Sequence, residues 1–253
     1  VQTIHRGAKR AFLGIEVAVS GDAVRKFDVP QNADLGSLDR GTVQGLLVES
    51  GLWTALRQRP YSKIPALDGR PHSIFVQAID TNPLAANPAV VLAEHADDFI
   101  RGLRVLKQLS DGAVYLCTAA GANIPGRDLP FVSHYEFDGP HPAGLPGTHI
   151  HCLDPVSTSK TVWYIGYQDV IAYGRLFGTG QLWTERVVAL SGPQVQTPRL
   201  LRTRLGASLV DLTADQAVRL LGALPADADV SDTVRCYSLA AKLALELAAR
   251  KRV

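Results

Sequence analysis

The chain has 253 residues and a formal net charge of +2 at pH 7, with 46% hydrophobic and 20% charged residues, which is typical of a soluble globular protein. The small charge and the lack of a nucleic-acid-binding signature argue against a nucleic-acid partner. Cys117, Cys152 and Cys236 are too few and too far apart for a disulfide framework or an iron–sulfur cluster, which needs about four thiolates.

No apolar run approaches the roughly 20 residues that span a bilayer. The sequence contains no Met and opens at Val1, so we expect a fragment of a longer protein or a processed one. The first predicted element is a strand near 15–19, where β-branched residues alternate with others. A helix is predicted over 39–50, with Asp39 as its N-cap, and a second short helix over 52–58.

The middle of the chain predicts strands and helices in alternation. Residues 73–79 form an apolar run of the buried-strand type. A long helix is expected over 88–109, and the next strands over 113–118 and 131–137. A strand, a helix and a second strand in this order predict a βαβ unit and therefore a parallel sheet.

Beyond the middle of the chain, 161–167 reads as a strand and 169–176 as a helix. The character then changes, because 185–191 and 199–204 are strand-like segments between Gly/Pro turns. We therefore expect a boundary near 181 and a small, mostly β unit after it. The last segment, 239–253, reads as an Ala/Leu-rich helix that is either native or foreign to the protein.

The segment 139–151 holds three Gly, three Pro and three His, which predicts a shaped loop rather than a regular helix or a central strand. His149 and His151 would point the same way on a strand and offer two imidazoles to a metal. Only Asp154 is a further ligand nearby, so ordinary hydrogen-bonded histidines are the favoured reading and no metal site is predicted.

Two other segments are candidates for binding. Asp80-Thr81-Asn82-Pro83-Leu84 follows a predicted strand, at the end where parallel α/β folds bind ligands, or it forms a simple Asx turn. Arg57 to Lys63 gathers three cations and Tyr61 around a proline bend. It is a solvated loop or a surface for phosphate or an acidic partner. No nucleophile triad and no G-x-G-x-x-G dinucleotide motif is present.

Several of these segments together resemble a known family, the A subunit of the bacterial sodium-translocating NADH:quinone oxidoreductase. The resemblance covers roughly 5–238 and rests on motifs that agree in order and spacing. They are Val48 to Arg57, Arg59 to Lys63, Asp80 to Leu84, the 139–151 segment, Asp154-Pro155-Val156, Tyr167 to Val170, and Leu205 to Leu209.

The resemblance implies an α/β fold, with a Rossmann-like parallel-sheet domain related to the flavin- and NADH-binding subunit of complex I and a small β-grasp-type (SLBB-like) module after it. The implied organisation has four parts. They are 1–38, a remnant of an N-terminal lipoyl-like or barrel-sandwich-like β region; 39–180, the Rossmann-like domain; 181–238, the β-grasp-like module; and 239–253, the helical tail.

The family also implies a peripheral subunit on the cytoplasmic face of the bacterial inner membrane. Its partners are the other subunits of a six-subunit complex, especially the membrane subunits. That complex passes electrons from NADH through flavins and iron–sulfur centres to ubiquinone and exports sodium. The complex I relative cradles flavin phosphate with a Gly-rich loop, whereas this chain has Leu52, Trp53 and Arg57 at the corresponding place. We therefore expect the fold to be kept and both redox cofactors to be lost.

The resulting hypothesis is a subunit that binds no cofactor of its own and has no catalytic residue, with ubiquinone as its candidate ligand. The alternatives are a flavin- or NADH-binding oxidoreductase and a purely structural assembly subunit. The candidate quinone-proximal or partner surface comprises Leu56, Arg57, Arg59, Tyr61 and Lys63. The candidate crevice residues are Asp80, Thr81, Asn82, His141, His149 and His151.

Overall fold

The computed structural model describes residues 1–6, 10–21, 23–30, 35–192 and 195–213. The expected end of the β-grasp-like module and the expected helix at 239–253 lie outside the described residues. Among the described residues, every helix is too short or too polar to cross a bilayer.

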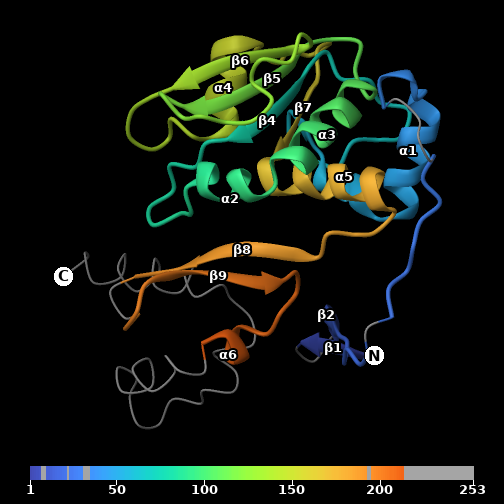
Figure 1. Ribbon diagram of the computed structural model, residues 1–253, viewed down its shortest axis with the longest axis vertical. Coiled ribbons are helices and arrows are strands. Elements are labelled where there is room, and N and C mark those ends of the chain that lie inside the picture. Colours follow the sequence, from blue (N-terminus) through green and yellow to red (C-terminus); the bar gives the residue numbers. More distant parts are fainter. Residues whose placement is uncertain (7–9, 22, 31–34, 193–194, 214–253) are drawn as a thin grey trace.

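A five-stranded sheet forms the centre of the molecule (Figure 1). In spatial order its strands are β3 (Arg57–Arg59), β7 (Val162–Gly166), β4 (Ile74–Ala78), β5 (Val114–Ala119) and β6 (Val132–Phe137). The last four run parallel and β3 runs antiparallel to β7. The predicted parallel sheet is therefore confirmed, and the apolar run of β4 is buried as a strand covered on both faces should be.

Helices cover both faces of this sheet. Side chains from four of them join one large core cluster with the sheet: α1 (Arg40–Glu49), α2 (Pro88–Glu94), α3 (Ala96–Lys107) and α5 (Tyr167–Thr179). Ile150 of α4 (Pro146–Leu153) packs in a second, smaller cluster with Phe75 and Cys117. The sheet thus forms the middle of three layers, and among the described helices α4 covers its second face (Figure 1).

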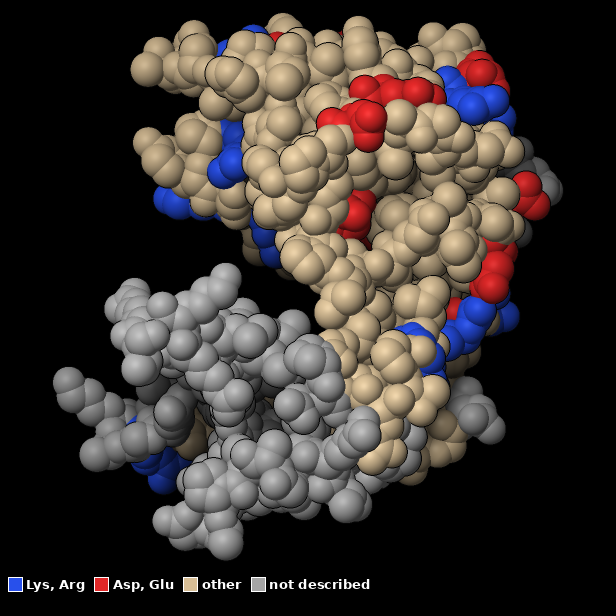
Figure 2. Space-filling model, turned by 90° about the vertical axis from the view of Figure 1, so that its left-hand side faces the viewer, with Lys and Arg blue, Asp and Glu red and all other residues tan. Residues whose placement is uncertain are grey.

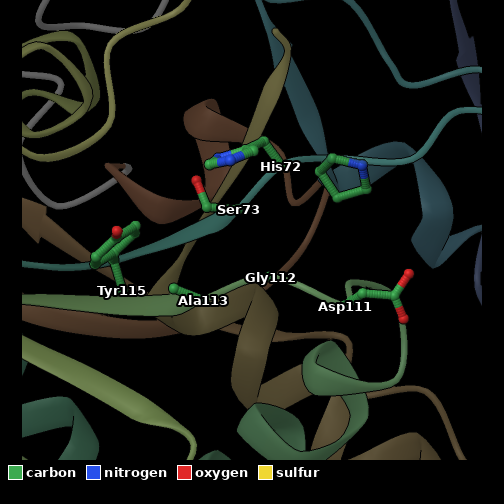
Figure 3. Close-up of a pocket in the computed structure, with 7 residues that line it drawn as sticks. His72, Ser73, Asp111, Gly112, Ala113 and Tyr115 are labelled. Carbon is green, nitrogen blue, oxygen red and sulfur yellow. The ribbon is translucent and has the colours of Figure 1, made fainter.

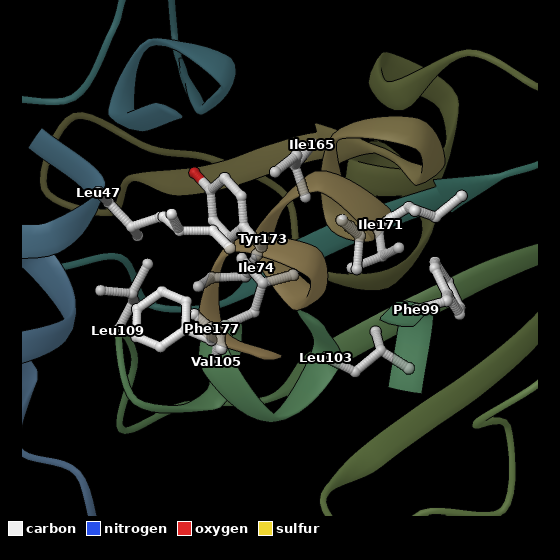
Figure 4. Packing of buried hydrophobic residues seen from close by; sticks show 14 of the residues in the cluster. Leu47, Ile74, Phe99, Leu103, Val105, Leu109, Ile165, Ile171, Tyr173 and Phe177 are labelled. Atoms are coloured by element: carbon white, nitrogen blue, oxygen red, sulfur yellow. The ribbon is translucent and has the colours of Figure 1, made fainter. Parts of the chain in front are cut away.

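The helices α3 and α5 cross very closely. A Cβ added at Gly102 would lie 2.0 Å from the carbonyl oxygen of Val170, and one at Gly174 would lie 1.7 Å from that of Asp98. Both positions therefore require glycine. Phe99 and Tyr173 fill the core around this crossing without any exposed surface (Figure 4).

Three helix predictions meet different outcomes. Asp39 caps α1 as predicted, because its carboxylate accepts from the Thr42 backbone N–H at 3.0 Å. The helix predicted over 52–58 is wrong beyond η2 (Leu52–Ala55), since the chain then extends to pair β3 with β7. The long helix over 88–109 is broken at His95, whose φ of −127° is not helical and whose ring packs on Trp183 at 5.0 Å.

The prediction that 139–151 forms a loop throughout is wrong in its second half. The helix α4 begins at Pro146 and continues to Leu153. Proline is favourable at the first helical position, because its fixed φ suits the helix and its missing N–H would be unpaired there anyway. The segment before it remains a turn, with Leu145 N–H bonded to the Pro142 carbonyl at 2.9 Å.

Two hairpins lie outside the central sheet. The strands β8 (Glu185–Leu190) and β9 (Arg199–Arg204) form where strands were predicted, and they pair antiparallel below α2 and α5 in Figure 1. The N-terminal strands β1 (Gln2–Arg6) and β2 (Ala11–Glu16) form the other hairpin. The predicted strand near 15–19 therefore ends earlier than expected. Short turns at η1 (Leu35–Ser37) and α6 (Leu209–Leu212) complete the described elements.

Candidate binding surface at the carboxyl edge of the sheet

The carboxyl edge of the sheet contains the point where the strand order reverses. The chain passes from β4 to β5 and β6 on one side and then returns to β7 on the other side of β4. Open α/β sheets bind their ligands in the crevice outside such a switch point. Figure 2 faces this edge: in its upper part Lys and Arg lie along the left border and again at the upper right, and Asp and Glu lie at the top, near the middle and on the right.

The loop after β4 meets the loop before α4 at this edge, as the sequence predicted. The hydroxyl of Thr81 lies 3.2 Å from His141 Nδ1 and accepts from the Gly144 backbone N–H at 2.9 Å. Asp80 accepts from the Asn82 backbone N–H at 2.9 Å, which is an Asx turn. Two of the candidate crevice residues are thus in contact, and Asp80 and Asn82 shape the turn beside them.

The two loops leave no gap where they touch. A Cβ added at Gly144 would lie 2.7 Å from the backbone nitrogen of Thr81. The Gln77 side chain donates to the Gly144 carbonyl at 3.2 Å and fixes the loop from the strand below. At Gly144 the expected crevice is therefore filled by the protein itself.

The two histidines of α4 face different surroundings. His149 is fully buried; its Nε2 lies 2.8 Å from the Ala143 carbonyl, and its ring lies 4.2 Å from that of Phe137. Burial lowers the pKa of His149. His151 is exposed. The two imidazoles would point the same way only on a strand, and α4 is a helix. No three His, Cys, Asp or Glu residues in the described part of the chain form a group suited to a metal ion.

The first turn of α5, which follows β7 at the switch point, is occupied by groups of the chain itself. The Gln168 amide donates to the Val187 carbonyl and accepts from the Val187 N–H, both at 3.0 Å. Arg186 donates to the carboxylate of Asp169 at 2.7 Å. Burial raises the pKa of Asp169, although Arg186 opposes that shift. Strand β8 is therefore bonded directly to the helix end where a doubly wound fold would bind phosphate.

Further contacts hold the β8–β9 hairpin against the helices. Arg202 of β9 pairs with Glu94 at the end of α2 and with Glu185 of β8, the latter at 2.7 Å. The Ser191 hydroxyl donates to the Leu84 carbonyl at 3.3 Å and so ties the end of β8 to the loop after β4. No sequence pattern predicted these contacts.

The Arg57 to Lys63 segment forms a tight hairpin beside β7. The Gln58 N–H donates to the Lys63 carbonyl at 2.7 Å, and Tyr61 at the tip has a left-handed φ of 75° and is 80% exposed. Lys63 Nζ lies 5.9 Å from the centre of the Tyr61 ring. An exposed aromatic ring in strained backbone beside a cation is a feature that folding alone does not require.

The remaining residues of this candidate surface, Leu56, Arg57 and Arg59, are less exposed to solvent than Tyr61. Leu56 is fully buried and belongs to the core. Arg57 is half-buried and donates to the Leu56 carbonyl at 2.9 Å. Arg59 reaches the first turn of α4, since a Cβ at Gly147 would lie 2.9 Å from its Nη2. Arg59 thereby joins the 57–63 hairpin to the segment that holds His141 and His149.

Comparison with known proteins gives the family of the chain. The family model described as "NqrA second alpha/beta domain" matches residues 38–182, and the one described as "NQRA C-terminal domain" matches 187–220. The latter supports the predicted SLBB-type module around β8 and β9.

The curated relatives agree with the family models. The A subunit of the Na(+)-translocating NADH-quinone reductase of Cellvibrio japonicus is 58% identical over 216 residues, covering 85% of this chain and 48% of the relative. Those of Histophilus somni (54%; 85% and 48%) and Neisseria meningitidis (53%; 86% and 49%) are similar. The chain thus spans about half the length of the curated relatives it matches. It belongs to the NqrA family, the A subunits of the Na(+)-translocating NADH-quinone reductase.

Proposed function

We propose that this chain is part of a peripheral subunit that contributes to ubiquinone reduction coupled to Na⁺ export, without carrying a redox cofactor itself. The observation that carries the proposal is the 58% identity to a protein named as the A subunit of a Na(+)-translocating NADH-quinone reductase. We place the subunit on the cytoplasmic face of the bacterial inner membrane, docked on the membrane subunits of the complex. NADH, flavins and iron–sulfur centres then belong to the complex as a whole.

We further propose that the α/β domain derives from a Rossmann-like ancestor related to the flavin- and NADH-binding subunit of complex I. The parallel order of β4 to β7 supports this relation. The residues at the switch point do not fit a dinucleotide, however. The carboxylate of Asp169 lies in the first turn of α5, where a pyrophosphate would need positive potential, and Gln168 bonds β8 into the same place.

An iron–sulfur cluster does not fit the described residues either. Cys117 is fully buried, and burial raises the pKa of its thiol to about 12, so it does not supply a thiolate. Cys152 is exposed on α4.

The domain organisation that we propose keeps the boundary near 181. We assign to the α/β domain before this boundary and to the β module after it a role in assembly and in shaping the quinone site.

The surface that we propose for this role is the 57–63 hairpin. Tyr61 supplies an exposed ring that can stack on a quinone head or fill a pocket of a partner. Lys63 and Arg59 supply positive charge beside it. Arg59 also contacts α4, so a partner bound at the hairpin would be connected to the 139–151 segment.

The test uses the full-length subunit in the assembled complex. Tyr61→Ala and Lys63→Ala should lower quinone reduction and labelling by a photoreactive quinone, whereas Val90→Ala, which removes an exposed apolar side chain from α2, should change neither. Labelling confined to distant surfaces would contradict the proposal.

A second pair of variants separates the scaffold alternative. If Arg57→Ala and Arg59→Ala abolish assembly while inhibitor binding stays intact in whatever complex still assembles, the subunit is structural only. We expect instead that the assembled fraction shows weakened inhibitor binding.

A further inference from the structure

Exposed apolar side chains gather on the 60–67 loop, which starts in the tip of the 57–63 hairpin and leads towards β4. Tyr61, Ile64 and Leu67 are 80%, 48% and 51% exposed. Within this loop only Pro65 is buried. Single exposed apolar residues are ordinary, whereas several on one protruding segment mark a contact surface.

The loop is held in this shape by hydrogen bonds on both of its arms. The indole N–H of Trp53, which is itself buried, donates to the Pro65 carbonyl at 2.9 Å. The Tyr164 hydroxyl donates to the Ser62 hydroxyl at 3.1 Å. The apolar side chains are therefore exposed on a fixed backbone and not on a loose one.

The chain that follows the loop is anchored as well. The Ser73 hydroxyl donates to the buried carboxylate of Asp154 at 2.6 Å, and a Cβ at Gly112 would lie 1.8 Å from the carbonyl oxygen of His72. Figure 3 shows His72 and Ser73 facing the segment that holds Gly112. A loop with fixed ends loses little conformational entropy when it binds.

The charge around the tip is entirely positive. The sequence from Gly51 to Leu67 contains Arg57, Arg59 and Lys63 but no Asp or Glu. Within the described ranges, neither Arg59 nor Lys63 forms an ion pair with a carboxylate. Lys63 Nζ instead lies 5.9 Å from the centre of the Tyr61 ring, so a cation and an aromatic ring share the tip.

We propose that the tip of the 60–67 loop docks on an anionic phospholipid surface. Tyr61 and Ile64 leave water at the level of the lipid headgroups, where a tyrosine ring is favourable. Lys63 and Arg59 then lie close to the lipid phosphates, which attract them.

A bilayer fits this tip better than a folded protein partner does. A stable protein interface needs about 20–30 residues from each side, whereas the exposed apolar and cationic side chains here lie on one short loop. Membrane contact needs only apolar area together with attraction to anionic lipids. This docking rests on the proposed function, which places the subunit at a membrane, and it gives the hairpin a lipid partner in addition to the quinone site.

Flotation of the full-length subunit with vesicles tests the docking in the absence of quinone and of the other subunits. One kind of vesicle is phosphatidylcholine alone, and the other is equal parts of phosphatidylglycerol and phosphatidylcholine. Binding should be saturable and about 25-fold stronger on the anionic vesicles, because Lys63 and Arg59 each contribute about a fivefold increase. Added salt should weaken it by screening these charges.

Variants locate the docking at the tip. Tyr61→Ala removes the apolar ring and Lys63→Ala removes a cation, so each should lower binding to the anionic vesicles about fivefold. Val90→Ala and Arg204→Ala remove an exposed apolar side chain and an exposed cation elsewhere on the surface and should leave binding unchanged. All four variants change exposed side chains, so an unchanged Tm verifies that each is folded.

The absence of saturable binding, equal binding to both kinds of vesicle, or binding that survives Tyr61→Ala and Lys63→Ala would each overturn the docking. So would binding to the detergent-solubilised membrane subunits alone that is lost in Tyr61→Ala, because the tip would then be a protein contact. Since the vesicles hold no quinone, a lack of quinone labelling with vesicle binding intact would count only against the proposed function.

Discussion

Replacing Gly174 by alanine tests the close crossing of α3 and α5 on which the core depends. The new Cβ would lie 1.7 Å from the Asp98 carbonyl oxygen and 2.9 Å from the backbone nitrogen of Gly102, whereas real Cβ contacts are essentially never below 3.0 Å. The atoms that clash are backbone atoms, so no side-chain rotation relieves the contact. The two helices must move apart, and Phe99 and Tyr173 must then lose packing.

The magnitude follows from two opposing effects. Alanine improves helix propensity by about 1 kcal/mol over glycine. Forcing a methyl group into a packed contact costs about 1–3 kcal/mol, and more where the backbone must shift. We take about 4 kcal/mol for this rigid clash, which leaves a net destabilisation of about 3 kcal/mol. For a chain of this size that lowers Tm by about 6–12 °C.

Thermal unfolding followed by circular dichroism measures this effect. Gly45→Ala is the matched control, because Gly45 is an exposed glycine within α1 and a Cβ there meets no atom within 4 Å. It should raise Tm by about 2–4 °C through helix propensity alone. If Gly174→Ala had the same Tm as the unchanged chain, or a higher one, the close crossing would be refuted.

Two further predictions concern the hairpin and the buried histidine. Arg202→Ala removes the ion pairs with Glu94 and Glu185 and should modestly speed amide exchange in β8 and β9, because exposed ion pairs contribute little stability. Arg204→Ala, which removes another exposed arginine from β9, should not, and equal exchange in both variants would contradict the role of Arg202. The lowered pKa of His149 predicts that stability present above the unfolded value of about 6.5 is lost as pH falls toward the folded pKa. Urea unfolding at pH 7.5 and pH 5 should show a steeper loss for the unchanged chain than for His149→Gln, and parallel losses would contradict a buried neutral imidazole.

The sequence predicted the four parallel strands because they are apolar or alternating runs bounded by turn residues, but it did not predict the antiparallel edge strand β3. The run 73–79 and the run 113–118 flank a helical pattern, and that order alone dictates a parallel pair. The helix boundaries were less predictable. The break at His95 depends on Trp183, which is distant in sequence, and the extension of the chain after Ala55 depends on pairing with β7.

The candidate site was predictable only in part. The contact of Thr81 with His141 follows from both segments lying at the carboxyl edge of one sheet. The bonds of Gln168 and Asp169 with β8 depend on how the hairpin is placed, which no local pattern encodes. The buried position of Leu56 likewise depends on the packing of the core. The helix that holds His149 was not predicted, because the prolines around it favoured a loop, although the helix begins at one of them, Pro146.

The central claim is that groups of the chain itself occupy the switch point, so that this subunit binds neither flavin nor NADH. Calorimetric titration of the chain, and of the full-length subunit, with FMN and with NADH tests it most directly. We predict no saturable binding of either nucleotide up to about 1 mM, the range of very weak affinity. Micromolar binding of either one, lost when Asp169 or Gln168 is replaced, would contradict the claim and favour a nucleotide-binding oxidoreductase.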